Sequence, residues 1–412
     1  MTILILGRAI QGIGGGGLQQ LTIIIITDIF SLRQRSLYLA LVEVMWAVAG
    51  GIGPVLGGLL ASSSWRWIFW LNLPITGVAF LLTIFFLDVH NPRTPLVIGL
   101  LAIDWLGIVS ILGFTLLLLL GLNLGGVTYP WSSPTVICLL AFSPLFLALF
   151  ILTEHKHAAH PIIPLHLLFG ATASARSNAA AYTTVFAHGV VLLGLEYYIP
   201  LYLQSARALS PARSGLLTLP LVLTNALTAV ACGVLIHRTG AYLSILRGGA
   251  AVLVGAGVGA CLQPPELAVQ ARVPQDAVAA AMAALGFVRN VATALSVVGG
   301  GAAFANGMAA REGPLVRAGV DAGAARELAG AEAAAANVER VGELLRGEAR
   351  LQGVVREAYA GALRNVWILY ACVAGVTVVA TLFVERSVLS DEHTETKTGI
   401  RSEERAGKGE NG

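Results

Sequence analysis

The sequence predicts an all-α fold, a polytopic bundle of transmembrane helices. The chain has 412 residues, of which 56% are hydrophobic and 12% are charged, whereas soluble domains carry about 25% charged residues. Its apolar residues gather in runs of roughly 20 or more, which is the length that a helix needs to cross a bilayer. Glycine is frequent inside these runs, and membrane helices tolerate it because neighbouring helices satisfy the freed backbone groups. The composition therefore excludes an ordinary soluble protein.

Ten apolar runs are candidate spans. The basic segment between the first two runs is expected in the cytosol, because cytoplasmic loops carry an excess of lysine and arginine. Trp65, Trp67 and Trp70 mark the start of the third run as an interfacial aromatic cluster. The runs are 3–26, 38–61, 66–87, 104–122, 134–153, 178–203, 214–236, 242–262, 275–306 and 366–384.

The remaining segments suggest how the chain is divided. An alanine-rich stretch before the last run has helical periodicity but too many charges to span, and the C-terminal tail lacks apolar periodicity, so disorder is expected there. The expected parts are 1–153, an N-terminal bundle remainder with linker helices; 154–177, a cytosolic loop; 178–305, part of a C-terminal bundle; 306–362, an exposed Ala-rich helical loop; 363–385, the last transmembrane helix; and 386–412, a disordered charged tail.

Nothing in the sequence indicates an enzyme, a cofactor, a metal site or a nucleic-acid partner. The four cysteines lie singly in apolar runs, without CxxC spacing. His155, His157 and His160 lack a second cluster that would complete a metal site. The glycine run 12–17 has no strand before it, which a dinucleotide-binding loop requires, and no GxxxxGK[ST] sequence is present.

Polar residues follow one face of the first run. Arg8, Gln11, Gly12 and Gly15 fall at i, i+3, i+4 and i+7, and Gln19 extends this stripe. An arginine inside a span is costly and usually faces a cavity or a partner. The stripe therefore indicates a functional face.

The second run carries the sequence GIGPVLGG. Gly53 and Gly57 are four residues apart and share a helix face, with Pro54 and Gly58 beside them. Missing side chains let another backbone approach closely. The pattern predicts a close helix–helix contact.

GxGPxxGG followed by WRWIFxxNxP resembles the antiporter motif of the major facilitator superfamily, and in particular its fourteen-helix drug:proton antiporter branch in the fungal form. The sequence RxxQGxGxG is similar to the pattern in which the arginine is implicated in proton coupling. GVLIHRTG resembles the gating-loop pattern GxxxDRxG: Gly233, Arg238 and Gly240 keep their places, and His237 stands where an acid is usual.

The resemblance implies a monomeric, proton-coupled efflux transporter of small lipophilic organic compounds (a drug, toxin or secondary metabolite) in the plasma membrane. Its partners would be a small-molecule substrate, protons and the lipid bilayer. Some candidates have simpler interpretations: Glu43 as a snorkelling surface carboxylate, Asp104 as a helix N-cap, and His188 or Glu196 as locally hydrogen-bonded groups. The candidates are Arg8, Gln11, Glu43 and Glu196 for proton coupling; Gly12, Gly53, Pro54, Gly57 and Gly58 for helix packing; Gly233, His237, Arg238 and Gly240 for gating; and Gln19, Asp104, His188, Arg289 and Asn290 for the substrate cavity.

Against the fourteen-helix pattern, about ten spans are present, so the expected fold is an incomplete facilitator fold. The chain starts where the fourth helix of that pattern would start, and about one more helix is missing near Leu262. We therefore expect an N-terminally truncated or mis-spliced product. A non-functional fragment and a siderophore-like importer of the same superfamily remain alternatives.

Overall fold

A computed structural model describes residues 2–64, 66–87, 95–156, 161–168, 172–252, 256–330, 338, 340–387 and 389. These residues form helices and no named strand, with one isolated bridge between Gly125 and Tyr129. The helices are α1 (Thr2–Ile29), α2 (Leu32–Ser63), α3 (Arg66–Trp70), α4 (Asn72–Phe86), α5 (Leu96–Ala102), α6 (Trp105–Leu124), α7 (Pro134–Lys156), α8 (Leu165–Leu168), α9 (Ala173–Ser205), α10 (Pro211–Thr239), α11 (Leu243–Ala251), α12 (Ala256–Ala260), α13 (Pro264–Gln270), the 3-10 helix η1 (Gln275–Ala277), α14 (Val278–Ala309), α15 (Glu312–Arg317), α16 (Ala322–Ala329), α17 (Val341–Leu344) and α18 (Ala349–Phe383).

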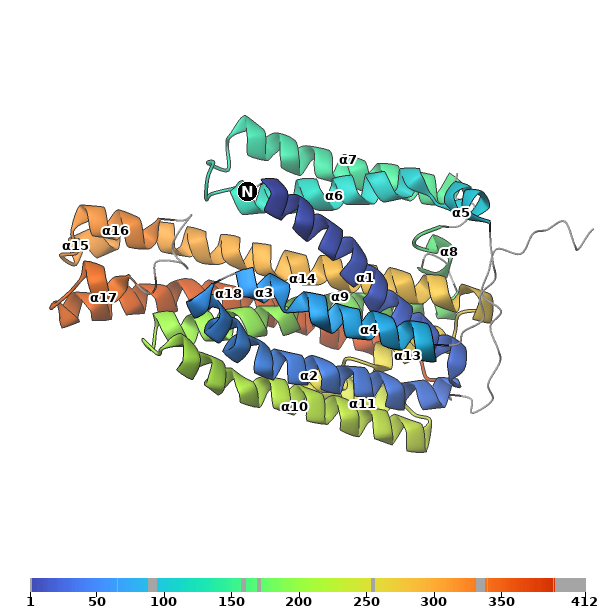
Figure 1. The fold of residues 1–412 in the computed structure, drawn as a ribbon. Helices are drawn as coiled ribbons and strands as arrows, with labels where there is room; N and C mark the ends of the chain where they lie inside the picture. Colours follow the sequence, from blue (N-terminus) through green and yellow to red (C-terminus); the bar gives the residue numbers. More distant parts are fainter. Residues whose placement is uncertain are drawn as a thin grey trace, which may run out of the picture.

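Within the described residues, nine helical stretches are long and apolar enough to cross a membrane. The long helices lie along a common direction, and α1 crosses the bundle obliquely (Figure 1). The all-α polytopic bundle that the composition predicts is confirmed. Nine of the ten expected runs correspond to these stretches, with α3 and α4 forming one of them.

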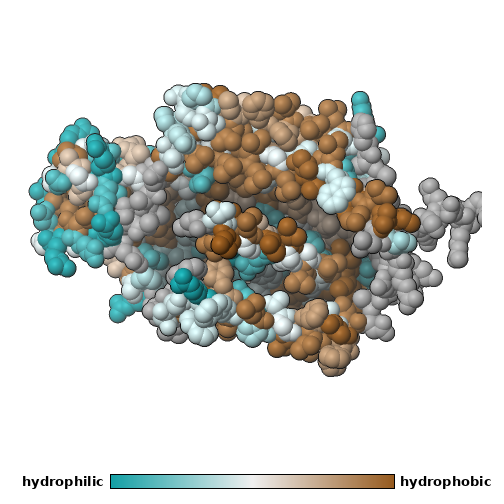
Figure 2. All heavy atoms as spheres, turned by 45° about the horizontal axis from the view of Figure 1, so that its top comes forward, coloured by the Kyte–Doolittle hydropathy of each residue, from teal (hydrophilic) through white to brown (hydrophobic). Residues whose placement is uncertain are grey.

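The outer surface of the bundle is apolar. None of the residues of α4 is buried, and Phe85 and Phe86 are 74% and 81% exposed. Apolar atoms cover most of the face in Figure 2, and polar atoms gather at the end that carries α15–α17. A bilayer core accommodates such a surface, because hydrocarbon rather than water then contacts these side chains.

One end of the bundle, which we call the basic end, collects arginines from distant parts of the chain. Arg33 at the start of α2 donates to the carbonyl oxygens of His237 and Arg238 at the end of α10. Arg272, which follows α13, pairs with Glu385 after α18. The basic end therefore contains the starts of α2, α9 and α14 and the ends of α1, α10 and α18 (Figure 1).

The expectation of one span over 242–262 is wrong. Helix α11 ends at Ala251 and α12 begins at Ala256, and both the end of α10 and the start of α14 lie at the basic end. Residues 240–252 and 256–277 therefore enter and leave the bundle at the same end, and we call them the re-entrant hairpin. The hairpin reaches mid-bundle at Val258, whose carbonyl lies 2.9 Å from Nε2 of His188, near the middle of α9. Glycines in the run 242–262 disfavour one continuous helix. An interrupted helix is tolerated at membrane depth where protein surrounds it.

The described residues of 306–362 are largely helical, and several of their apolar side chains are buried rather than exposed. Leu315, Leu328, Val341 and Tyr359 are buried and belong to one apolar core with residues of α9, α14 and α18. Apolar positions between the charges give these helices a buried face, which the overall charge of the segment conceals. Helix α18 also begins earlier than expected, at Ala349.

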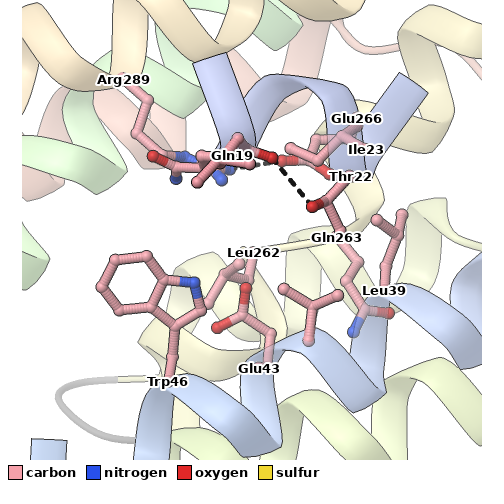
Figure 3. Close-up of a pocket in the computed structure, with 12 residues that line it drawn as sticks. Gln19, Thr22, Ile23, Leu39, Glu43, Trp46, Leu262, Gln263, Glu266 and Arg289 are labelled. Carbon is pink, nitrogen blue, oxygen red and sulfur yellow. Dashed lines mark hydrogen bonds and ion pairs between the residues drawn. The ribbon is translucent and has the colours of Figure 1, made fainter. Parts of the chain in front are cut away.

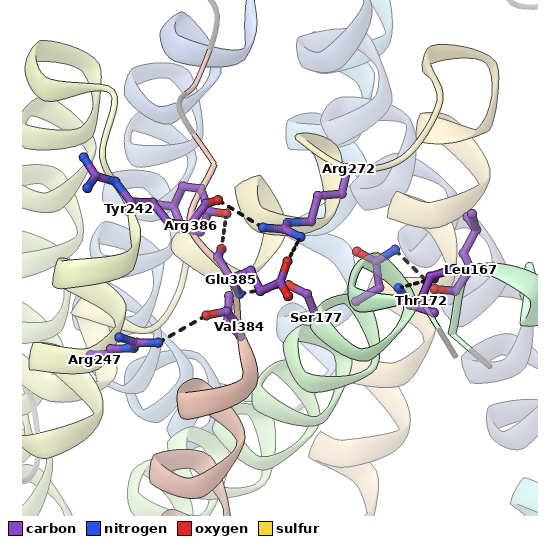
Figure 4. Close-up of polar contacts among 11 residues, drawn as sticks. Leu167, Thr172, Ser177, Tyr242, Arg247, Arg272, Val384, Glu385 and Arg386 are labelled. Atoms are coloured by element: carbon purple, nitrogen blue, oxygen red, sulfur yellow. Dashed lines mark hydrogen bonds and ion pairs between the residues drawn. The ribbon is translucent and has the colours of Figure 1, made fainter. Parts of the chain in front are cut away.

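The chain after α18 forms a C-terminal strap, made of residues 384–387 and 389, across the basic end. The Glu385 carboxylate accepts from Arg272 at 2.7 Å, and its carbonyl accepts from the Tyr242 hydroxyl at 2.8 Å (Figure 4). Burial raises the pKa of Tyr242, so its hydroxyl remains a neutral donor. Val384 and Leu389 are buried. The strap therefore joins the entry of the re-entrant hairpin, at Tyr242, to its exit, at Arg272.

Cutting the chain after Phe383 is expected to lower the free energy of unfolding by roughly 3–5 kcal/mol, because the strap buries two large apolar side chains worth about 1.5–3 kcal/mol each. Cutting after Ser390 keeps the strap and is the matched control, expected to unfold like the full chain. Thermal unfolding of the detergent-purified proteins measures both. Equal melting temperatures for the two truncations would show that the strap contributes nothing.

Candidate functional site

A cavity of about 240 Å³ lies between α1, α2, α14 and the re-entrant hairpin. Glu43 and Trp46 lie on one side of it, and Gln19 and Arg289 lie on the other (Figure 3). Its polar residues come from segments that are far apart in the sequence, which only the folded bundle brings together. The lining consists of Leu18, Gln19, Thr22, Ile23, Leu39, Val42, Glu43, Trp46, Leu262, Gln263, Glu266 and Arg289.

An ion pair crosses the hairpin side of the cavity. Nη2 of Arg289 on α14 lies 2.7 Å from Oε1 of Glu266 on α13, and the two side chains are 18% and 6% exposed. Glu43 on α2 lines the same cavity, and no hydrogen bond or ion pair joins it to any of the described residues. The cavity thus holds one cation and two carboxyl groups, of which one is paired.

Helix α13 presents a polar face to the interior. Gln263, Glu266 and Gln270 recur at i, i+3 and i+7 on a helix that begins with two prolines, and every residue of α13 is buried. Gln270 accepts from Nη1 of Arg35 on α2 at 3.0 Å. With its amide oriented so that both polar atoms have partners, Gln263 donates to the Ser36 carbonyl and accepts from the Ala40 N–H of α2, each at 3.1 Å. The hairpin therefore contacts α2 through Gln263 and Gln270, and it contacts α14 through Glu266.

The predicted gating residues lie at the basic end and contact α2 there. The hydroxyl of Ser36 on α2 donates to the Gly233 carbonyl at 3.0 Å, and the Arg33 guanidinium donates to the carbonyls of His237 and Arg238. Gly240 ends α10 at φ 67°, a left-handed conformation that favours glycine. We call the contacts between residues 33–36 and 233–240 the inner latch. In these contacts Arg33 binds the backbone oxygens of His237 and Arg238 rather than a side-chain acid.

Helices α2 and α10 also meet closely farther along. A Cβ on Gly50 would lie 3.6 Å from Val222, and one on Gly51 would lie 3.5 Å from Leu219. A Cβ on Gly53 or Gly57 meets none of the described residues within 4 Å. Two other glycines of the run, rather than the predicted pair, therefore face α10; the surroundings of Pro54 and Gly58 lie outside the described residues.

The polar stripe of α1 divides at its middle. Arg8 donates to Gln11 at 2.8 Å, both side chains are exposed, and neither lines the cavity. A Cβ added at Gly12, on the same half of α1, would meet none of the described atoms within 4 Å. Gln19, on the second half of α1, does line the cavity.

The other candidates lie outside the cavity. Asp104 caps α6 by accepting from the Gly107 N–H at 2.8 Å. His188 is buried and contacts the Val258 carbonyl of the re-entrant hairpin. Glu196 is half-buried on α9, and Asn290 is exposed. Within the described residues no group of three metal-ligating side chains occurs; His157 and His160 lie outside those residues.

Sequence reasoning missed Gln263, Glu266 and Trp46. The two prolines of QPPELAVQ suggest a loop, yet prolines at the first positions of a helix are favourable. The spacing of Gln263, Glu266 and Gln270 was the signal that could have identified a helix with one polar face.

Comparison with known proteins decides the family. Residues 1–298 match the family model described as the Major Facilitator Superfamily. The chain belongs to this superfamily. It is therefore a multi-pass membrane protein of a transporter family rather than an enzyme.

Several curated relatives of this superfamily member align over most of the chain. "Efflux pump dotC" of Dothistroma septosporum is 37% identical over 430 residues, covering 98% of this chain and 72% of the relative. "MFS-type transporter ppz2" of Metarhizium majus is 36% identical over 431 residues, with the same two coverages. "MFS-type efflux pump MMF1" of Pseudozyma antarctica is 32% identical over 334 residues, covering 74% of this chain and 60% of the relative.

Proposed function

We propose that this protein exports small lipophilic organic compounds in exchange for protons, as a monomer in the plasma membrane and as a member of the fourteen-helix drug:proton antiporter branch. The observation that carries the proposal is the cavity between α1, α2, α13 and α14, with Glu43, Glu266 and Arg289 in an otherwise largely apolar lining. Two of the relatives are named efflux pumps, which favours export over import.

The residues have separable roles in this proposal. Ionisable side chains within membrane segments mark ion and proton pathways, and Glu43 is the carboxyl in the cavity that is free to exchange a proton with water. The apolar lining and Trp46 bind a lipophilic substrate by burying its apolar surface, while Gln19 and Gln263 orient it through hydrogen bonds. The inner latch closes the basic end, which we place in the cytosol.

Glu43→Gln is expected to reduce proton-driven export at least tenfold, because an amide cannot release a proton when substrate binds. Export of rhodamine 6G from yeast cells that express the protein, with and without a protonophore, measures this effect. Glu196→Gln, an equivalent change in a half-buried carboxyl outside the cavity, is the matched control and is expected to retain most activity. Arg8→Ala tests whether the exposed half of α1 takes part in coupling.

Two results would contradict the proposal. Protonophore-insensitive export by the wild type would exclude proton coupling. Uptake of the probe, rather than its export, under an inward proton gradient would reverse the assigned direction.

A further inference from the structure

The cavity has one cation for two carboxyl groups on opposite walls. Among the described residues that line it, Arg289 is the single basic side chain, whereas Glu266 comes from the re-entrant hairpin and Glu43 from α2. Arg289 binds Glu266, and Glu43 lies on the opposite side of the same cavity (Figure 3). Each carboxyl is therefore placed to interact with the same guanidinium.

An ionised carboxyl without a partner is unfavourable inside a membrane bundle. With one guanidinium available, one of the two carboxyl groups can be ionised and paired, and the other then holds a proton. Among the described residues, His188 of α9 contacts the Val258 carbonyl of the hairpin, and Glu196 lies farther along the same helix.

We propose that Arg289 exchanges partners between Glu266 and Glu43 during transport, and that each exchange moves one proton. When Arg289 leaves Glu266, Glu266 takes up a proton and Glu43 releases one, so the charge of the site stays constant. Glu266, which the hairpin supplies, is thereby a second proton-carrying residue. This inference rests on the proposed proton-coupled function.

The exchange also changes which elements are tied together. In the structure, the pair with Glu266 holds α14 to the hairpin, while Gln270 holds the hairpin to Arg35 of α2. With Glu43 as its partner, Arg289 instead ties α14 directly to α2 and releases the mid-bundle part of the hairpin. The proton on each carboxyl thus selects which side of the cavity is closed.

Infrared difference spectroscopy of the purified protein tests the exchange without a known substrate, because a protonated carboxyl has its own C=O stretching band. Glu43→Gln is expected to remove one protonated-carboxyl signal. Glu266→Gln is expected to remove the same signal, because Arg289 then binds Glu43 and ionises it. Glu266→Gln/Arg289→Gln is expected to restore the signal, and Arg289→Gln alone to add one.

The proposal is overturned if Glu266→Gln leaves the Glu43 signal in place, or if adding Arg289→Gln to it changes nothing. Glu196→Gln is the control. Any protonated-carboxyl signal that this change removes should be equally large in the wild type and in the Glu266→Gln protein. Should Glu266→Gln fail to fold, Glu266→Asp in protein labelled with ¹³C-glutamate replaces it: part of the signal should move from labelled glutamate to unlabelled aspartate.

The two proposals fail in different ways. If the infrared pattern holds but export by the wild type does not respond to a protonophore, partner exchange stands and proton-driven export fails. If export is proton-driven but Glu266→Gln does not change the protonated-carboxyl signal of Glu43, the proposed function stands and partner exchange fails.

Discussion

Replacing Arg289 with alanine is expected to destabilise the protein by about 3–5 kcal/mol and to abolish export. Without Arg289, the buried Glu266 carboxyl must either stay charged in a poorly solvated position or take up a proton, and both cost free energy. The Glu266 side chain is 6% exposed, so water cannot replace the lost guanidinium. Thermal unfolding in detergent and export of rhodamine 6G measure the two effects.

A matched double variant separates the loss of the charge pair from the loss of packing. In Glu266→Gln/Arg289→Gln, both charges are removed while side-chain volume is largely kept, so stability should return to within about 1 kcal/mol of the wild type. Export should remain absent, because the cavity then lacks its cation. A stable, fully active Arg289→Ala protein would show that the ion pair matters neither to the fold nor to transport.

Replacing Gly233 with leucine is expected to cost about 3 kcal/mol and to reduce export at least tenfold. A Cβ at this position would lie 2.7 Å from the Ser36 carbonyl oxygen and 2.8 Å from the Ala40 Cβ, so α2 and α10 must separate. Overpacking of a tight contact typically costs about 1–3 kcal/mol, and separation also breaks the Ser36–Gly233 hydrogen bond of the inner latch.

Gly53→Leu is the matched control for that change. It lies on α2, and a Cβ there meets no described atom within 4 Å, so the expected change in stability is within about 1 kcal/mol. Unfolding temperatures of the two variants, with their export rates, make the comparison. If Gly53→Leu is the more damaging substitution, the close approach of α2 lies at the predicted Gly53 face rather than at Gly233.

Long apolar runs made most of the fold predictable, because length and composition alone identify a span in a bilayer. The same signal was misleading at 242–262, where the apolar length was sufficient but glycines and the position of α14 at the basic end require a hairpin. It also misled at 306–362, where frequent charges hid the buried face that contains Leu315 and Leu328.

The site was predictable where a polar residue interrupts an apolar helix. Gln19, Glu43 and Arg289 stand out in this way, and the structure brings all three to one cavity. Arg8 has the same appearance in the sequence, yet it is exposed on α1, because helix periodicity indicates which residues share a face and not which neighbour that face meets. Glu266 lacked an apolar run around it, so the spacing of Gln263, Glu266 and Gln270 was the one signal in the sequence that pointed to it.

Thiol labelling of the cavity is the most direct test of its role as the transport pathway. In a protein whose four native cysteines are replaced, Gln19→Cys should react with a charged methanethiosulfonate reagent, and excess rhodamine 6G should slow the reaction. Ile13→Cys, on the exposed apolar side of the same helix, should react slowly and without protection by the probe. Equal reaction at both positions, with no effect of rhodamine 6G, would contradict a water-accessible substrate cavity between α1, α2, α13 and α14.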